Sequence, residues 1–428
     1  MTGNAAFTDK QVRNGLGVSI LASSLGVLHY GLLVPGGLLA TGFLLWMGVS
    51  KFLVAALAVT LPLSRFAEIL GSWVVQRTGR RRQLFFWAHV ASRLLWVPIV
   101  LIPSAIGAEH DVARLAALFA LLFSSSLLAS AGANAWLSWM GDLIPGDVRG
   151  RYFGTRQIFE VSAMLLGGLA VGWFMGGAPD YARYLVVFPA LVAFGIADIL
   201  LFRWVPHPEA PPRPDGASVR ELLFRPLRDP QYRRLIFFLV TWMIASEMFG
   251  PFMWIFVSSP EYLNLSYLTG FAIMAVSGVC RVGTSYFWGY VADRWSPKKV
   301  LTLCVIISLT PPFYYLFATR DFTLPLYLAW GVGSLAWSGI GVLTFQYTIS
   351  MAPARERSMY LACHSAIMGL VSAAGYLAAV GIVWLLRDVH LHVGPWVWCD
   401  LQILFCLTGL GRIVSLYPLS RMTDTQRS

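Results

Sequence analysis

Residues Gly289–Lys299 read Gly-Tyr-Val-Ala-Asp-Arg-Trp-Ser-Pro-Lys-Lys, a short charged turn between two long apolar stretches. A weaker copy, Ser-Trp-Val-Val-Gln-Arg-Thr-Gly-Arg-Arg-Arg, covers Ser72–Arg82, roughly half the chain earlier, and also lies between apolar stretches. A charged tight turn that recurs at half-chain spacing among apolar segments indicates two duplicated halves. Internal repeats of this kind are typical of proteins that span membranes.

The composition supports a membrane protein. The chain is 57% hydrophobic and 12% charged, with a mean hydropathy of +0.65, whereas a soluble domain has about twice that charged fraction. Apolar runs of about 20 residues, long enough to cross a bilayer, recur along the whole chain. These runs must be helices, because lipid offers no partners for exposed backbone groups. The twelve predicted spans are Gly15–Leu45, Phe52–Val75, Leu84–Pro103, Ala113–Met140, Phe153–Gly176, Tyr184–Trp204, Leu235–Val257, Ser266–Ala292, Val300–Ala318, Leu324–Ser350, Tyr360–Leu386 and Pro395–Tyr417.

The net charge of +11 is distributed unevenly between the two sides of the predicted membrane. A cytoplasmic N-terminus assigns most of the basic residues to cytoplasmic loops, which is the positive-inside pattern. We therefore expect both termini in the cytoplasm, contacts with anionic lipid headgroups, and no nucleic-acid binding. The basic residues on the predicted inner side are Arg77, Arg80, Arg81, Arg82, Arg149, Arg151, Arg156, Arg203, Arg213, Arg220, Arg225, Arg228, Arg233, Arg234, Arg294, Lys298, Lys299, Arg355 and Arg357; those on the outer side are Lys51, Arg114, Arg183, Arg320 and Arg387.

A second pair of loops repeats in the same way. Pro145-Gly-Asp-Val-Arg-Gly-Arg-Tyr152 and Pro353-Ala-Arg-Glu-Arg-Ser-Met-Tyr360 share Pro, Arg and Tyr in one register. Between the halves, residues 205–234 are polar and rich in proline, and Ser218 and Glu221 have the spacing of a helix-capping box. We predict a six-helix bundle over residues 1–204, a cytoplasmic linker with a short amphipathic helix over 205–234, and a second six-helix bundle with a tail over 235–428.

These turns resemble the signature of the major facilitator superfamily, Gly-x-x-x-Asp-Arg-x-Gly-Arg-Arg/Lys, which follows the second span and recurs more weakly after the eighth. Gly289, Asp293, Arg294 and Lys298 match it in the second copy, and Arg77, Gly79, Arg80 and Arg81 match it in the first. The resemblance implies a cytoplasmic gate in which an arginine of the first turn binds an acid at the end of the fourth span, and the aspartate of the second turn faces the start of the fifth. The expected gate residues are Arg77, Gly79, Asp142, Arg149, Gly289, Asp293, Arg294 and Arg357, with an Arg77–Asp142 pair. The alternative is that these loops only set the topology.

Ionisable residues inside predicted spans are candidates for function, because exposing them to lipid is costly. Glu247, near the middle of the seventh span, is the first candidate for binding a coupled proton, and Glu160 is the second. The alternative for Glu247 is a permanent pair with Arg281. By resemblance, the third, sixth, ninth and twelfth spans face lipid, so Arg93, Asp198 and Arg412 are expected to extend toward the membrane surface. The substrate-cavity candidates are Arg65, Glu68, Asn134, Trp136, Arg281, Trp337 and Gln346; for Arg65 and Glu68 the alternative is a self-neutralised structural pair.

We therefore expect a monomeric secondary transporter that moves a sugar-like or drug-like organic solute by alternating access and is coupled to protons. The five cysteines lack metal-ligand or disulfide spacing, and no metal, cofactor or catalytic residue is predicted. The expected location is the bacterial inner membrane, with lipids as partners. A transporter-like receptor that binds without transport and a membrane-embedded transferase remain the alternatives; a transferase needs acids or histidines clustered at one membrane surface.

Overall fold

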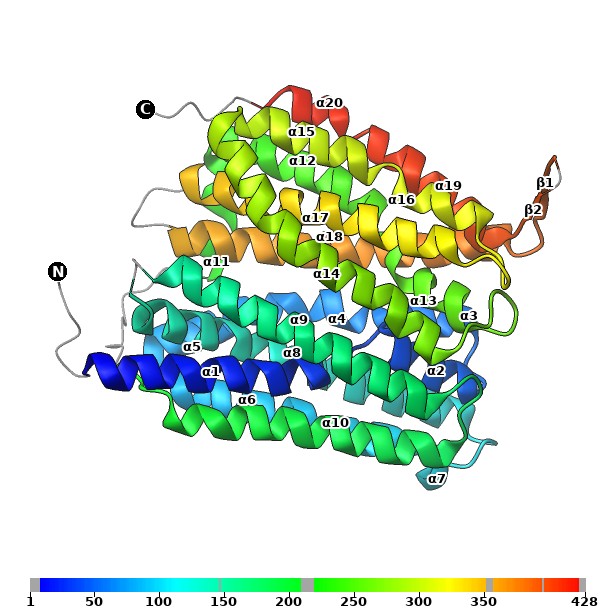
Figure 1. The fold of residues 1–428 in the computed structure, drawn as a ribbon, viewed down its shortest axis with the longest axis horizontal. Coiled ribbons are helices and arrows are strands. Elements are labelled where there is room, and N and C mark those ends of the chain that lie inside the picture. The colour runs from blue at the N-terminus through cyan, green and yellow to red at the C-terminus, as the bar shows by residue number, and fades with distance from the viewer. Residues whose placement is uncertain (1–7, 146–147, 209–218, 352–356, 395, 423–428) are drawn as a thin grey trace.

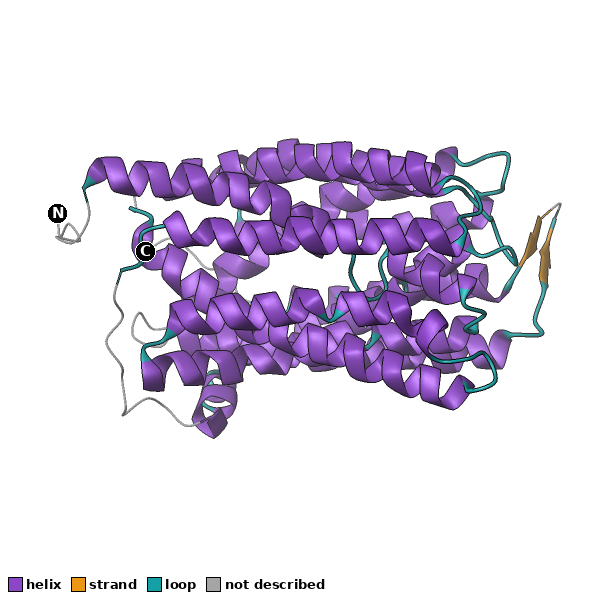
Figure 2. Ribbon diagram, turned by 90° about the horizontal axis from the view of Figure 1, so that it is seen from below, coloured by secondary structure: helices purple, strands orange, loops and turns teal. Residues whose placement is uncertain are grey.

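Long helices run along one common direction and turn back at the two ends of the molecule (Figure 1). The computed structural model describes residues 8–145, 148–208, 219–351, 357–394 and 396–422. The first helix begins and the last helix ends at the same end of the molecule, which we call the terminal end. At the other, here the hairpin end, the antiparallel strands β1 (Leu391–Val393) and β2 (Trp396–Trp398) project from the bundle (Figure 2).

The helices fall into two groups along the chain. The first half contains α1 Asp9–Tyr30, α2 Leu38–Trp46, α3 Lys51–Ala58, α4 Thr60–Leu63, η1 Ser64–Phe66, α5 Ala67–Thr78, α6 Arg81–Leu94, α7 Trp96–Ala105, α8 Asp111–Leu143, α9 Arg149–Met175, α10 Tyr181–Leu201 and η2 Phe202–Trp204. The linker region and second half contain α11 Val219–Phe224, η3 Pro226–Arg228, α12 Pro230–Glu247, α13 Gly250–Ser258, α14 Tyr267–Arg294, α15 Pro297–Ser308, α16 Pro311–Tyr314, η4 Tyr315–Phe317, α17 Leu324–Met351, α18 Arg357–Leu386, α19 Asp400–Ile413 and α20 Leu416–Ser420.

Eleven helical segments in the described part of the chain are long and apolar enough to cross a membrane, and they match the second to twelfth predicted spans. The predicted first span, Gly15–Leu45, is two helices instead of one. The chain leaves the helix after Tyr30, and Gly36 takes a positive φ of 76°. Pro35 precedes that glycine and has no N–H to continue a helical ladder, so α1 and α2 are separate.

The two copies of the charged turn reverse the chain by different local chemistry. In the first copy, Gly79 ends α5 in the left-handed conformation, with φ of 67°, which a residue with a side chain rarely adopts. In the second, Ser296 caps α15 by accepting a hydrogen bond from the Lys299 N–H at 3.4 Å, and Pro297 takes the first helical position. In the first copy, therefore, a glycine ends the helix before the turn, whereas in the second copy a serine and a proline start the helix after it.

At the hairpin end, the two halves share one apolar core. A single cluster of buried side chains there includes Phe43 and Phe188 from the first half and Phe252 and Phe405 from the second. In Figure 1 the helices of the first half lie below those of the second, with α9 against α14 at the boundary. The hydrophobic contact that joins the halves is thus concentrated at this end.

Toward the terminal end, each half has its own apolar core. One cluster contains Phe85, Trp139 and Tyr152 and is made only of residues from the first half and the start of the linker. The other contains Tyr232 and Leu419 and is made only of residues from the linker region and second half. The halves are thus joined by a common core at one end and hold separate cores at the other.

Candidate functional site

A cavity of about 430 Å³, here called the large cavity, lies in the second half. Glu247 reaches it from the last position of α12, just before the chain bends at Met248 and Phe249 and resumes as α13. Pro251 lacks the N–H that a continuous helix would need, which explains this break. The bend places a carboxylate at a helix end inside the bundle.

Two arginines share this cavity with Glu247. Arg281 lines it from α14 and Arg412 from α19. The positive charges that act on Glu247 are those of Arg65 and Arg412. The ion pairs of the described residues do not include a Glu247–Arg281 pair, the alternative expected for this acid.

Indole rings form the apolar wall of the cavity. Trp337 packs against Trp242 with ring centroids 4.4 Å apart, and Trp330 packs against Trp254 at 5.2 Å. Trp330 Nε1 also donates a hydrogen bond to the Tyr315 hydroxyl at 2.9 Å, which holds its ring in place. The cavity therefore combines flat aromatic surfaces with three charged side chains.

A second cavity of about 340 Å³ lies between the two halves and shares Arg281 and Trp330 with the first. Its first-half wall contains Glu160 of α9. The Tyr30 hydroxyl and Arg156 Nη2 each donate to Glu160 Oε1 at 2.7 Å. Glu160 thus lies at the interface between the halves, but it is already held by two donors.

A third cavity, of about 170 Å³, lies inside the first half and contains a buried ion pair. Arg93 Nη2 of α6 donates to Asp198 Oδ2 of α10 at 2.7 Å. Arg93 and Asp198 are each 5% exposed and Arg412 is 3% exposed. The expectation that these three residues extend toward the membrane surface is wrong. A glycine three residues before each of Asp198 and Arg412, on the same helix, admits a side chain from a neighbouring helix and could have signalled the burial.

Of the other residues predicted to line the substrate cavity, some line one of these cavities and others contact neighbouring helices or are exposed. Trp136 lies 4.5 Å from the Arg156 guanidinium and lines the third cavity. Asn134 Nδ2 donates to the Glu68 carbonyl at 2.9 Å and to Ser72 Oγ at 3.1 Å, so it ties α8 to α5. Gln346 is exposed and is absent from the described linings of the cavities above.

Arg65 and Glu68 lie where the first half meets α18. Gly369 of α18 packs directly on Arg65, leaving no room for a larger residue. Arg65 acts as a neighbouring positive charge on both Glu68 and Glu247. Arg65 therefore connects the first half electrostatically to the acid of the large cavity.

At the terminal end, the predicted acid of the gate has a different partner. Arg81 Nη1 binds Asp142 Oδ2 at 2.5 Å, whereas Arg77 lies over the Trp73 ring at 4.6 Å, so the predicted Arg77–Asp142 pair is wrong. Gly79 reverses the chain, and Arg81, the first residue of α6, then reaches the end of α8.

The remaining gate residues have the following positions. Arg149 Nη2 donates to the Gly141 and Ile144 carbonyls at 2.9 and 3.3 Å and so caps the end of α8. Arg294 lies 4.0 Å from the Tyr290 ring. Gly289 and the side chains of Asp293 and Arg357 lie outside the residues described in side-chain detail, so the contact predicted for Asp293 stays a prediction.

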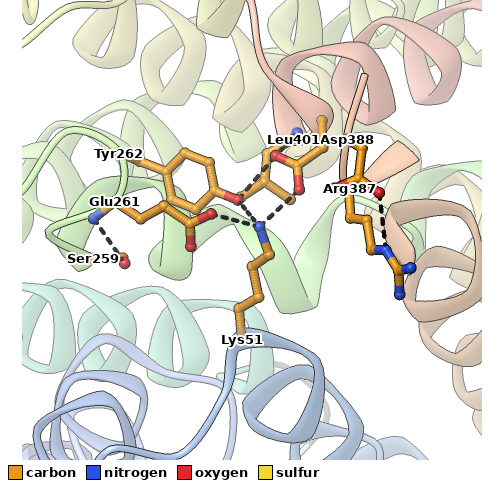
Figure 3. A network of polar contacts seen from close by, with 8 residues as sticks. Lys51, Ser259, Glu261, Tyr262, Arg387, Asp388 and Leu401 are labelled. Carbon is orange, nitrogen blue, oxygen red and sulfur yellow. Dashed lines mark hydrogen bonds and ion pairs between the residues drawn. The ribbon is translucent and has the colours of Figure 1, made fainter. Parts of the chain in front are cut away.

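At the hairpin end, a polar network joins the halves (Figure 3). Lys51 Nζ of the first half donates to Glu261 Oε1 and Asp400 Oδ2 at 2.8 Å each and to the Tyr262 hydroxyl at 2.6 Å. The Tyr262 hydroxyl in turn donates to Asp400 Oδ1 at 2.9 Å. Burial, followed by the Asp400 carboxylate, raises the pKa of Tyr262, so it remains a donor. Sequence reasoning treated Lys51 only as an outer-loop charge.

Two tyrosines add to this closure at the hairpin end. The Tyr184 and Tyr267 hydroxyls, one from each half, are 2.8 Å apart. The Tyr267 N–H also donates to the Gly176 carbonyl at 3.2 Å. Gly172 lies so close to the Leu268 backbone that a side chain there would collide with it. Polar contacts and close backbone packing therefore hold the halves together at this end.

Among the described residues, no group of three or more His, Cys, Asp or Glu is arranged to hold a metal ion.

Neither a family model nor a curated protein sequence matches this chain. Solved structures match it over nearly its whole length. A mutant of the nucleoside transporter NupG aligns with 95% of this chain and 99% of its own, at 14% identity and a TM-score of 0.72. The inward-open xylose transporter XylE from E. coli aligns over 96% and 97%, at 14% identity and 0.68. A POT family transporter in complex with a thioalcohol-conjugated peptide aligns over 95% and 96%, at 13% identity and 0.67.

At these identities the similarity concerns the fold. The chain shares its fold with these transporters, in agreement with the type of fold that the two charged turns predicted.

Proposed function

We propose that this protein is a secondary transporter that moves a small organic solute across a membrane by alternating access. One observation carries the proposal: adjoining cavities of about 430 and 340 Å³ lie within and between two helical bundles that share an apolar core at one end only. Two bundles that share a core at one end and are separate at the other can rock against each other about a central binding site. The transporters with this fold supply supporting analogy.

The terminal end is assigned to the cytoplasm, because Arg77, Arg80, Arg81, Arg82 and Arg149 all lie there. With that orientation we propose an inward-facing state, closed on the outside by the Lys51 network. The moving bodies are residues 1–204 and 235–428, joined by the linker 205–234. A bacterial inner membrane is the proposed location.

Closure at the hairpin end depends on Lys51, because it is the cation that binds two acids of the opposite half. Replacing it with methionine removes that attraction and leaves Asp400, which is 4% exposed, without a cation. We expect Lys51→Met to shift the population toward an outward-open state by about 5- to 150-fold, equivalent to about 1–3 kcal/mol of coupling energy.

The shift is measured as the distance between spin labels at exposed positions 112 and 322, one on each half at the hairpin end. Arg387→Met is the matched control, because it removes an exposed arginine at the same end whose ion-pair partner, Asp388, is in its own half. An unchanged distance distribution in Lys51→Met would contradict the gate.

Glu247 is proposed to carry the coupled proton. It lies at a helix end, lines the cavity and is influenced by arginines from both halves, so a change in its charge alters the attraction between the moving bodies. We expect Glu247→Gln to retain solute exchange but to lose accumulation driven by a pH gradient.

The test is uptake of a solute panel into proteoliposomes with and without a pH gradient, using Glu109→Gln as the control because Glu109 is an exposed acid outside the cavities. Gradient-driven accumulation by Glu247→Gln would end the coupling role. Binding of a solute without any movement across the bilayer would favour a receptor over a transporter.

A further inference from the structure

Arg412 is a buried arginine in the wall of the large cavity. Its side chain is 3% exposed, and its Nη1 donates to the Ser308 carbonyl. Its Nε, by contrast, is buried and has no hydrogen-bond partner in the protein. A buried guanidinium with an unused donor is costly unless something else satisfies it. Arg412 also lines the large cavity, so its positive charge lies at the cavity wall.

Ser246 provides a second unused polar atom in the same wall. It precedes Glu247 on α12, is 5% exposed, and its Oγ has no hydrogen-bond partner in the protein. Both Ser246 and Arg412 line the large cavity. Two buried groups able to donate hydrogen bonds thus lie in one wall, which favours a ligand with acceptor atoms.

The charges of the lining favour an anionic ligand. Among the described lining residues, two arginines, Arg281 and Arg412, face one acid, Glu247, so basic side chains outnumber acidic ones. The adjoining cavity does not remove this excess, because Glu160 is already paired with Arg156. A buried positive charge attracts an anion strongly because little water screens it.

The shape of the cavity limits the rest of the ligand. Trp330 and Trp337 supply flat apolar walls, and the volume of about 430 Å³ is typical of pockets for small organic molecules. Tryptophan faces pack well against planar rings. The cavity therefore suits an acceptor group attached to a flat body.

From these observations we infer that the substrate is an organic anion in which a carboxylate is attached to a flat ring, with the carboxylate on Arg412 and the ring between Trp330 and Trp337. This inference rests on the proposed transport function, since it assigns the large cavity to the solute. It narrows the sugar-like or drug-like solute expected from the sequence to one chemical class.

The test uses three matched sets of compounds built on benzene, indole and naphthalene rings. Each set contains a carboxylate, the corresponding amide and the corresponding amine, so that only the charge of the polar group changes. Affinity is measured on the purified full-length protein through the change in tryptophan fluorescence. We expect the carboxylate to bind about tenfold or more tighter than the amide on at least one ring, the gain of a charge-assisted hydrogen bond.

Four variants separate a charge effect from a folding defect. Arg412→Gln is expected to abolish the preference for the carboxylate, and Arg412→Lys to retain part of it because the charge remains. Glu247→Gln is expected to tighten carboxylate binding about fivefold or more, because it removes the negative charge of the lining. A gain in affinity is an outcome that simple destabilisation does not produce. Arg387→Gln removes an exposed arginine of the same half and should change nothing.

Two results would overturn the inference: no carboxylate preference on any of the three rings, or tighter binding of the amines. Failure of binding by all nine compounds would overturn it as well. Uptake into liposomes distinguishes this failure from failure of the proposed function. Transport of neutral or cationic solutes without any carboxylate preference would support the proposed transport function and contradict the inference that the substrate is an anion. Carboxylate binding without transport would support the anionic ligand and contradict the transport function.

Discussion

In the first half, Arg93 and Asp198 form an ion pair between α6 and α10, and both side chains are buried. In the second half, Arg412 lies at the comparable place on α19, three residues after Gly409, as Asp198 lies three residues after Gly195. Its neighbouring acid, Glu247, comes from α12, and both residues line the large cavity. A buried charge near the end of α10 is therefore acidic, whereas the buried charge near the end of α19 is basic.

The two halves of this duplicated fold therefore use their buried charges in different ways. Gly26 of α1 packs directly on the Asp198 carboxylate, and Arg93 donates a hydrogen bond to it, so this acid is held on two sides although it borders the cavity of about 170 Å³. The acid of the second half is on the first long helix of that half, where it faces open volume. We interpret the first pair as structural and the second as functional.

The largest expected effect tests the structural assignment. Asp198→Asn leaves Arg93 buried without a counter-charge, which should reduce stability by about 3–5 kcal/mol. Glu247→Gln should reduce it much less, because Glu247 is only partly buried, whereas Asp198 is buried and bonds Arg93 directly. The measurement is the thermal unfolding midpoint of each purified variant in one detergent.

An apolar replacement of the whole pair provides the control. Arg93→Met combined with Asp198→Leu removes both charges together and should recover most of the loss. Equal losses in Asp198→Asn and Glu247→Gln would erase the distinction between the halves.

A smaller loss of stability is expected from two side chains that donate hydrogen bonds to backbone carbonyls at the end of each half. Arg81 donates to the Pro208 carbonyl and also binds Asp142, and its side chain is fully buried. Lys298 donates to the Ser420 and Met422 carbonyls at 2.8 and 2.7 Å near the chain surface. Arg81→Gln should therefore cost about 2–3 kcal/mol and Lys298→Gln about 1 kcal/mol.

Thermal midpoints of the two single variants and of the double variant test this comparison. Additive losses are expected, because the two contacts lie in different halves. A larger loss in Lys298→Gln than in Arg81→Gln would show that burial does not set the ranking.

The smallest expected effect depends on pH and concerns the start of the linker. Burial, followed by the charges of Arg81 and Arg82, lowers the pKa of His207 to about 4. Its Nε2 accepts a hydrogen bond from Arg81 Nε at 3.3 Å, which requires the neutral ring. Because the folded pKa lies below that of the unfolded chain, the contribution is complete above about pH 6.5 and is lost as the pH falls toward 4.

The effect should be modest, since His207 is only partly buried. Thermal midpoints between pH 7 and 4.5 should fall more steeply for the natural protein than for His207→Gln. Parallel curves for the two proteins would exclude a role for this histidine.

Much of the helical framework followed from the sequence. Eleven predicted spans match helices, and the charged turn at Gly79 has the left-handed glycine that its motif implied. The division after Tyr30 could not be read from hydropathy, because the segment stays apolar while Pro35 and Gly36 interrupt it. Apolar runs report burial in lipid, whereas a break depends on local backbone chemistry.

The candidate site was only partly predictable. Glu247, Arg281 and Trp337 were all expected at a cavity and line the same one. Asn134 was also expected there, but it instead joins two helices of the first half. A sequence shows that a polar residue lies within a span; it does not show which neighbour its side chain meets.

By itself the sequence determined the membrane class, the positions of most helices and the uneven distribution of positive charge, because these depend on local composition and on residues near one another in the chain. Only the tertiary structure decided that Arg81 meets Asp142, that Lys51 binds Asp400 across the two halves, and that Arg412 borders a cavity. Each of these contacts joins residues far apart in the chain, and so depends on how helices rotate and pack against one another.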